Sequence, residues 1–137
     1  MAGERQIDGK WSTNGGKFCG VELSRDMETG DISMGQPEFA ASMSPPRQCK
    51  LGEEEETTPG QVSELRAVNG SGGWLSSQSR PDLSCQVSLA QQGLPKAKGR
   101  HVRLSQQMVR RAKQFADVRV VYRAIPAARL RVCGHSD

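Results

Sequence analysis

The residues with the clearest chemical potential are the lysines and arginines gathered in the C-terminal half of the sequence. Residues 83–137 carry 11 Lys and Arg against 2 Asp and Glu, whereas residues 1–82 carry 8 against 13. A basic segment of this strength favours a polyanionic partner, nucleic acid first, although a solvated basic surface would have the same composition. Contacts to phosphates would hold a nucleic acid without reading its sequence. The candidates for such contacts are Lys96, Lys98, Arg100, Arg103, Arg110, Arg111 and Lys113.

The tetrapeptide Ser79-Arg80-Pro81-Asp82 is a second stretch whose residue types suggest a site. It has the pattern of a helix start, with Ser79 as the cap, Pro81 in the first turn and the Asp82 carboxylate reaching back to the cap. Arg80 is not needed for capping. It could form a buried pair with a nearby carboxylate or contact a backbone, and we include it among the candidate nucleic-acid contacts.

Four consecutive glutamates, Glu53 to Glu56, lie within a stretch rich in proline and polar residues, 44–57. A run of like charges is typical of solvated coil, so we interpret the stretch as an acidic linker rather than a metal-binding patch. The four cysteines form no Cys-x-x-Cys pair, so zinc is not expected. We expect them to be reduced, small apolar residues.

Composition sets further bounds on the partners and on the core. No apolar run approaches the roughly 20 residues that span a bilayer, and no charged-then-apolar leader opens the sequence. We therefore expect no membrane partner, no secretion and no structural disulfide. The hydrophobic share of 35% and the aromatic share of 4% predict a thin core and marginal stability for the 137 residues. Nothing indicates a small-molecule substrate.

The elements that must position the basic residues begin with a predicted hairpin. Residues 1–16 are polar and glycine-rich and predict a disordered lead-in. Alternating residues over 17–23 and again over 32–34, separated by turn residues, predict a β-hairpin within 17–36. A short helix with a proline in its first turn should follow and end by residue 43.

Three longer helices are expected after the acidic linker. Thr58 and Gln61 match a capping box at the start of the first helix. Three glycines between residues 70 and 73 interrupt that helix, so we expect either a local break or a second backbone packed close against it. The next two helices should cover 79–93 and 101–115.

The C-terminal residues predict two short strands. Residues 118–125 are rich in β-branched side chains, and 130–133 form a second short apolar run. The predicted fold is therefore α+β, with an N-terminal β-hairpin, three central helices and a C-terminal strand pair.

Several segments, taken in order, resemble copia-type retrotransposon Pol polyproteins. They are "KFCGVEL", "GDISMGQPEF", "LRAVNGSGGWLSSQSRPDLSCQVS", "VRRAKQ" and "LRVCGHSD", and they fall within residues 17–137. In that family a hairpin closes the reverse transcriptase palm, helices follow, and a Gly-Tyr-Ser-Asp segment enters ribonuclease H. This chain departs from the pattern at Phe39 and His135, where tyrosine is usual, and at Cys85, which replaces an aromatic residue.

The resemblance implies that the chain is a fragment of a larger polymerase fold, and it assigns a role to each part. Residues 17–43 would be the palm-end hairpin with its short helix, and 44–57 the acidic linker. Residues 58–116 would be thumb- and connection-like helices that hold the template–primer duplex, and 117–137 strands leading into ribonuclease H. The implied partners are an RNA/DNA template–primer duplex and the remainder of the Pol polyprotein, in cytoplasmic particles or the nucleus.

The resemblance also bears on catalysis. The family's RNA-directed DNA polymerase uses paired aspartates that hold two Mg²⁺ ions, and the Tyr-x-Asp-Asp motif that carries them does not occur here. Asp137 aligns with the first catalytic carboxylate of ribonuclease H and is the candidate metal ligand. One carboxylate cannot build a two-metal site, so we expect neither tight Mg²⁺ binding nor cleavage by this chain.

Two alternatives from other functional classes remain open at this stage. The chain could be a stand-alone basic nucleic-acid-binding module, which would bind with a steep salt dependence. It could also be an interaction module whose acidic linker meets a basic protein partner.

Overall fold

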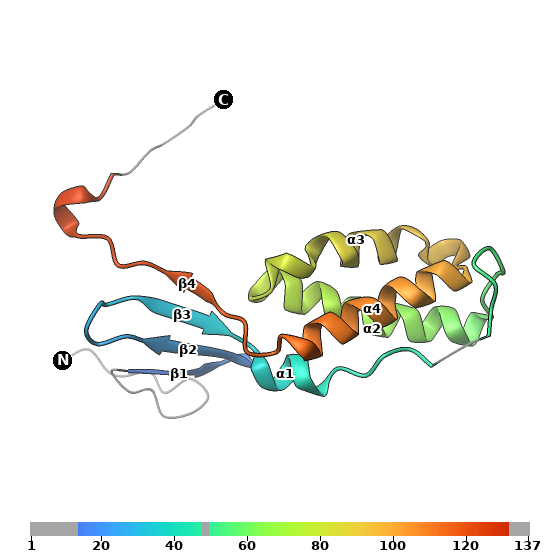
Figure 1. Ribbon diagram of the computed structural model, residues 1–137, viewed down its shortest axis with the longest axis horizontal. Coiled ribbons are helices and arrows are strands. Elements are labelled where there is room, and N and C mark those ends of the chain that lie inside the picture. The colour runs from blue at the N-terminus through green and yellow to red at the C-terminus, as the bar shows by residue number, and fades with distance from the viewer. Residues whose placement is uncertain (1–13, 48–49, 132–137) are drawn as a thin grey trace.

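The computed structural model describes residues 14–47 and 50–131. In these residues four α-helices and a four-stranded antiparallel sheet form an α+β fold, which confirms the predicted fold class. Figure 1 shows the sheet at one end of the molecule and the longer helices bundled at the other. The predicted lead-in lies outside the described residues except for its last three, of which Gly15 and Gly16 already belong to a strand.

The sheet combines strands from both ends of the chain. Strands β1 (Gly15–Phe18), β2 (Val21–Arg25) and β3 (Ile32–Gly35) follow one another, and β4 (Val120–Tyr122) adds to the edge of β3. In the β3–β4 pair Met34 lies opposite Val120. Because β4 directly follows the last helix, this pairing ties the end of the helical bundle to the N-terminal sheet.

The predicted strand over 17–23 is interrupted by a turn. Cys19 and Gly20 both have positive φ, 48° and 77°, and reverse the chain between β1 and β2. Two positive φ angles in a two-residue loop are typical of a type I′ turn, which suits the twist of a hairpin. The prediction of one strand over 17–23 was therefore wrong, because the alternation of side chains continues across such a short turn. In place of the predicted hairpin, β1, β2 and β3 form a three-stranded meander.

The expectation of a C-terminal strand pair was also wrong. Ala127–Arg129 form a 3₁₀ turn, Leu130 and Arg131 lie in no strand, and 132–133 fall outside the described residues. The open edge of β3 supplies the partner for β4 instead. Two ion pairs hold β4 and the residues around it on the sheet, Arg119 to Glu22 at 2.8 Å and Arg123 to Asp31 at 2.6 Å.

The three central helices are present. After the short helix α1 (Pro37–Ser42) come α2 (Pro59–Gln78), α3 (Ser84–Gln92) and α4 (Gly99–Gln114). The last of these begins two residues earlier than the sequence predicted.

The capping box predicted at the start of α2 is confirmed. The Gln61 N–H donates to Thr58 Oγ1 at 3.3 Å, and the Thr58 N–H donates to Gln61 Oε1 at 2.8 Å. Pro59 occupies the first turn, where its missing N–H costs nothing. These contacts fix where the helix starts.

The glycines of α2 neither break the helix nor admit a second backbone, contrary to expectation. The helix is continuous from Pro59 to Gln78. A Cβ at Gly72 would lie 2.8 Å from Met108 Sδ and 3.3 Å from Val87 Cγ2, so side chains of α4 and α3 fill that space. Nothing lies within 4 Å of a Cβ built at Gly70, and the structure gives no reason for a glycine there.

The main core lies between the helices. It is a cluster of buried apolar side chains from α1, α2, α4 and the α3 region, and α3 and α4 pack along each other in Figure 1. Its buried members are Ala40, Met43, Leu75, Leu83, Val87, Met108, Val109 and Ala112. This packing fixes which face of α4 is buried and which face meets solvent.

Candidate nucleic-acid interface

Helix α4 carries most of the predicted phosphate contacts, and its two faces differ sharply. The buried face holds Val102, Met108, Val109 and Ala112, each at most 3% exposed. The exposed residues of the helix contain no acidic and no apolar side chain. They are Arg100, Arg103, Gln107, Arg110, Arg111, Lys113 and Gln114. The helix therefore presents a continuous row of cationic and amide side chains to solvent.

The cations at the N-terminal end of α4 are paired with the acidic linker. Lys98 Nζ and Arg100 Nη1 each lie 2.6 Å from a carboxylate oxygen of Glu54, and Arg103 Nη1 lies 2.7 Å from Glu53. The hydrogen bond from Lys98 is the main reason that the pKa of Glu54 lies below its ordinary value. The four glutamates are exposed and lie outside the helices and strands, as expected, but two of them, Glu53 and Glu54, bind cations 44 to 50 residues away, which the sequence did not indicate.

Fewer protein contacts engage the cations at the C-terminal end of α4 and Lys96, which lies in the 3₁₀ turn Leu94–Lys96 before the helix. Arg110 and Lys96 are exposed and form no ion pair with a described residue. Lys113 donates to the carbonyl of Met43 at 3.3 Å, which leaves donors for another acceptor. These three side chains are the candidates that remain available to phosphate.

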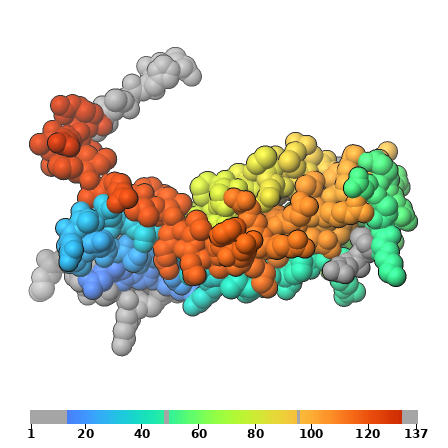
Figure 2. All heavy atoms as spheres, in the orientation of Figure 1, coloured from blue at the N-terminus to red at the C-terminus, as the bar shows by residue number. Residues whose placement is uncertain are grey.

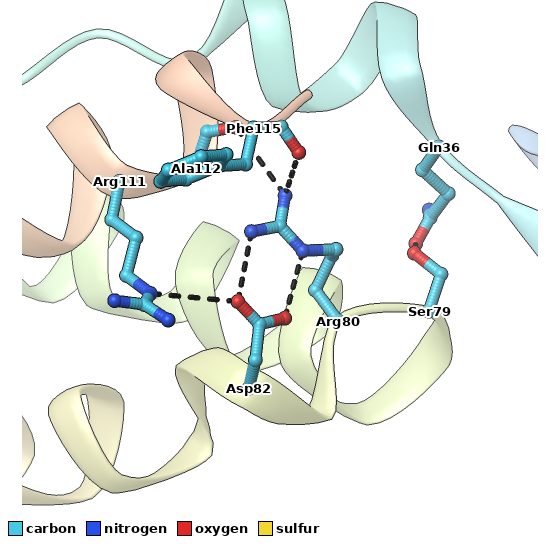
Figure 3. Close-up of polar contacts among 7 residues, drawn as sticks. All are labelled: Gln36, Ser79, Arg80, Asp82, Arg111, Ala112 and Phe115. Atoms are coloured by element: carbon cyan, nitrogen blue, oxygen red, sulfur yellow. Dashed lines mark hydrogen bonds and ion pairs between the residues drawn. The ribbon is translucent and has the colours of Figure 1, made fainter. Parts of the chain in front are cut away.

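Arg80 does not belong to the exposed surface. Its side chain is 1% exposed, so the expectation that it contacts nucleic acid was wrong. Its guanidinium binds both carboxylate oxygens of Asp82, at 2.8 and 2.9 Å, and Nη1 donates to the carbonyl of Phe115 at 2.7 Å (Figure 3). A longer bond of 3.4 Å reaches the carbonyl of Ala112. Of the alternatives that the sequence left open for Arg80, the structure has the buried pair with a carboxylate. The same guanidinium also donates to carbonyls at the end of α4, which have no partner within the helix.

Asp82 joins this contact to the exposed row of α4. Arg111 Nε lies 3.5 Å from its second carboxylate oxygen, and the Arg111 guanidinium lies 5.9 Å from the centre of the Phe115 ring. The hydrogen bond from Arg80 is the main cause that lowers the pKa of Asp82 below its ordinary value. The carboxylate therefore stays ionised and fixes the position of Arg111.

The capping roles predicted for Ser79 and Asp82 were wrong. Ser79 ends α2, and its hydroxyl donates to Gln36 Oε1 at 2.9 Å in the buried link to α1 (Figure 3). Arg80 precedes the 3₁₀ turn Pro81–Leu83, which has no side-chain cap. The Asp82 carboxylate is engaged by two arginines and is not free to reach back to the backbone.

Sequence reasoning missed two polar contacts that hold α4 in place. The buried hydroxyl of Ser105 donates to Asn69 Oδ1 at 2.7 Å and so links α4 to α2. At the start of α4, the Lys98 N–H donates to His101 Nδ1 at 2.9 Å. Burial lowers the pKa of His101, which favours the neutral imidazole that this bond requires. A polar residue at an apolar position of the helical pattern was the available signal for Ser105.

No metal centre is found in the part of the chain that the structure describes. Groups of three or more His, Cys, Asp or Glu side chains that could hold an ion do not occur there. Asp137, the candidate metal ligand, lies outside the described residues. Cys19 and Cys85 are free and exposed.

Comparison with known proteins returns no match. The chain matches no protein-family model, no curated protein and no solved structure. Among the described helices, none has the length and the apolar character needed to cross a membrane.

Proposed function

We propose that this chain is a segment of a copia-type retrotransposon Pol polyprotein that holds a template–primer duplex. The observation that carries the proposal is the exposed face of α4, on which every side chain is Arg, Lys or Gln. The 16 residues of the helix span about 24 Å at 1.5 Å per residue. Each strand of a duplex presents a phosphate roughly every 3.4 Å along the axis, so several phosphates lie within reach of this row.

The type of contact predicts how the duplex is held. Arginine and lysine side chains on one helix face contact phosphates and carry no sequence information. Binding should therefore tolerate any base sequence and weaken steeply with salt. A sheet built from an N-terminal hairpin and followed by three helices also supports the proposal, since the resemblance implies that order of elements.

Catalysis is not part of the proposed role. The sequence has no Tyr-x-Asp-Asp motif, and a two-metal site needs more carboxylates than Asp137 alone provides. In the complete polyprotein, Mg²⁺ would be held by residues outside this chain. The chain itself would contribute the surface that positions the duplex.

The contacts of the acidic linker favour the duplex-binding role over the protein-interaction alternative. Glu53 and Glu54 already pair with cations of the same chain, so a basic protein partner would have to displace them. The stand-alone module remains distinguishable by sequencing the genomic and transcript flanks of the reading frame. An upstream Tyr-x-Asp-Asp segment and a downstream continuation with more carboxylates support the polyprotein, and flanks with neither favour the stand-alone module.

The binding test uses an RNA–DNA hybrid of random sequence and the purified chain. Replacing Lys96 and Arg110 together by glutamine should weaken binding about tenfold or more at 0.1 M salt, because each lost phosphate contact lowers affinity. The matched control replaces Arg25 and Arg129, which are exposed on β2 and in the 3₁₀ turn Ala127–Arg129, and should change affinity far less. Equal losses in both variants, primer extension, or hybrid cleavage by the chain would contradict the proposed role.

A further inference from the structure

The residues Leu51–Thr57, here called the acidic loop, are docked on the N-terminal end of α4. The Gly99 N–H donates to the carbonyl of Glu55 at 3.0 Å, and the Arg100 N–H donates to that of Glu53 at 3.1 Å. A Cβ at Gly99 would lie 2.2 Å from the carbonyl oxygen of Gly52, so only glycine admits the loop this closely. Figure 2 shows the loop, in green, covering the end of the bundle farthest from the sheet.

Backbone contacts therefore hold the loop, and the glutamate side chains are not needed for that. The N–H groups that the loop occupies are those at which the start of a helix binds phosphate. The carboxylates of Glu53 and Glu54 then neutralise the three cations nearest to this helix end. The loop supplies carbonyls and carboxylates in the place where a nucleic-acid backbone would supply phosphate oxygens.

The glutamate contacts are of a kind that a competing anion can displace. The side chains of Glu53 and Glu54 are 73% and 64% exposed. Exposed ion pairs contribute little to stability and are screened by salt. Their larger effect is on the local potential, because they cancel positive charge on half of the exposed face of α4.

We propose that the acidic loop is an intramolecular competitor that masks the N-terminal half of the α4 cation row from nucleic-acid duplex. A duplex then binds first at the C-terminal half, around Arg110, and reaches Lys98, Arg100 and Arg103 only by displacing Glu53 and Glu54. This inference rests on the proposed duplex-binding function and adds a contact that limits it.

The test compares two variants that each lose two negative charges. Replacing Glu53 and Glu54 by glutamine removes the carboxylates that pair with α4. The control replaces Glu28 and Glu38, which are exposed and lie outside the acidic loop; Glu38 pairs with Lys17 on β1, a cation outside α4. Glutamine keeps the side-chain length in all four positions, and the circular dichroism spectrum and melting temperature establish that each variant is folded.

Duplex affinity and its salt dependence are then measured by fluorescence anisotropy with the RNA–DNA hybrid. The Glu53/Glu54 variant should bind about tenfold or more tightly at 0.1 M salt than the wild type. Its slope should be steeper by nearly three, since each of the three added phosphate contacts contributes roughly 0.9. The control should stay within about twofold of the wild type. A gain confined to the first variant supports the inference.

Other outcomes overturn it in distinguishable ways. An equal gain in both variants would mean that net charge alone acts, without masking. A wild type that binds, loses affinity on Arg110→Gln and gains nothing from the Glu53/Glu54 replacement would refute the competitor while leaving duplex binding in place. If none of the variants binds the hybrid, both the competitor and the proposed function fail.

Discussion

Replacing Asp82 by alanine removes the carboxylate that neutralises a guanidinium with 1% of its side chain exposed. Removing one partner of a buried ion pair costs about 3–5 kcal/mol, because the other charge is left buried without compensation. The Asp82 side chain is itself 34% exposed and also faces Arg111, so its own charge can be hydrated when Arg80 is absent. The cost of breaking this pair should therefore depend on which partner is removed.

The expected free energies follow from that asymmetry. Asp82→Ala should cost about 3 kcal/mol or more, and Arg80→Met about 1–3 kcal/mol, chiefly from the lost hydrogen bonds to carbonyls at the end of α4. The double variant should cost little more than Arg80→Met alone, because Asp82 matters mainly while Arg80 is present. Urea unfolding followed by circular dichroism gives the three values, with Glu28→Ala as an exposed control.

The pH dependence gives a second reading of the same contact. The folded pKa of Asp82 lies below its ordinary 3.8, chiefly because Arg80 donates to it. The stabilisation is thus present above pH 3.8 and is lost as the pH falls through the folded pKa. Asp82→Ala should flatten this acid limb. A cost of Asp82→Ala below about 1 kcal/mol would refute the reasoning. So would a cost of Arg80→Met that equals or exceeds the cost of Asp82→Ala.

Further predictions concern α4, α2 and the first hairpin. Because the folded pKa of His101 lies below 6.5, the unfolded chain binds the proton first, and the wild type should lose stability as the pH falls below 6.5. His101→Gln keeps an acceptor for the Lys98 N–H at the start of α4 and should remove this loss. An unchanged dependence of stability on pH contradicts this. Gly99→Ala should lower the melting temperature and undock the acidic loop, because the new Cβ would overlap the carbonyl of Gly52. Gly70→Ala should instead stabilise α2 by about 0.5–1 kcal/mol, because its Cβ would lie in open space. Thermal melts compare the two variants, and equal shifts of the melting temperature would exclude the clash at Gly99. Cys19→Asn should stabilise the hairpin by about 0.5–1 kcal/mol, because asparagine accepts positive φ more readily and precedes glycine well in this turn; a loss in urea unfolding would rule out the turn assignment.

The helices could be predicted because their signals are local. Thr58 and Gln61 stand three residues apart, and Leu83, Val87 and Ala90 are all buried, Leu83 at the end of the 3₁₀ turn and the other two in α3. All of these positions are where the sequence placed them. The α+β class follows from the same patterns, since a period of two at the N-terminus gives way to helical periodicity.

The site could not be predicted in the same way, because its contacts are between distant residues. Arg80 reaches a carbonyl 35 residues away, and Glu53 binds a cation 50 residues away. The charge of these residues was visible, but whether each charge meets solvent depends on how α2, α3 and α4 pack. The edge pairing of β4 with β3 likewise joins residues about 90 positions apart, which no local pattern encodes.

The most direct test of duplex binding by α4 is the slope of log affinity against log salt for a random-sequence RNA–DNA hybrid. With Lys96, Arg110 and Lys113 available to phosphate, the wild-type slope should be about −3, and Arg110→Gln should reduce its magnitude by about 0.9. Arg25→Gln, which removes an equal charge from the sheet, should leave the slope unchanged. A slope near zero, or the same reduction for Arg25→Gln as for Arg110→Gln, would contradict phosphate binding by the exposed face of α4.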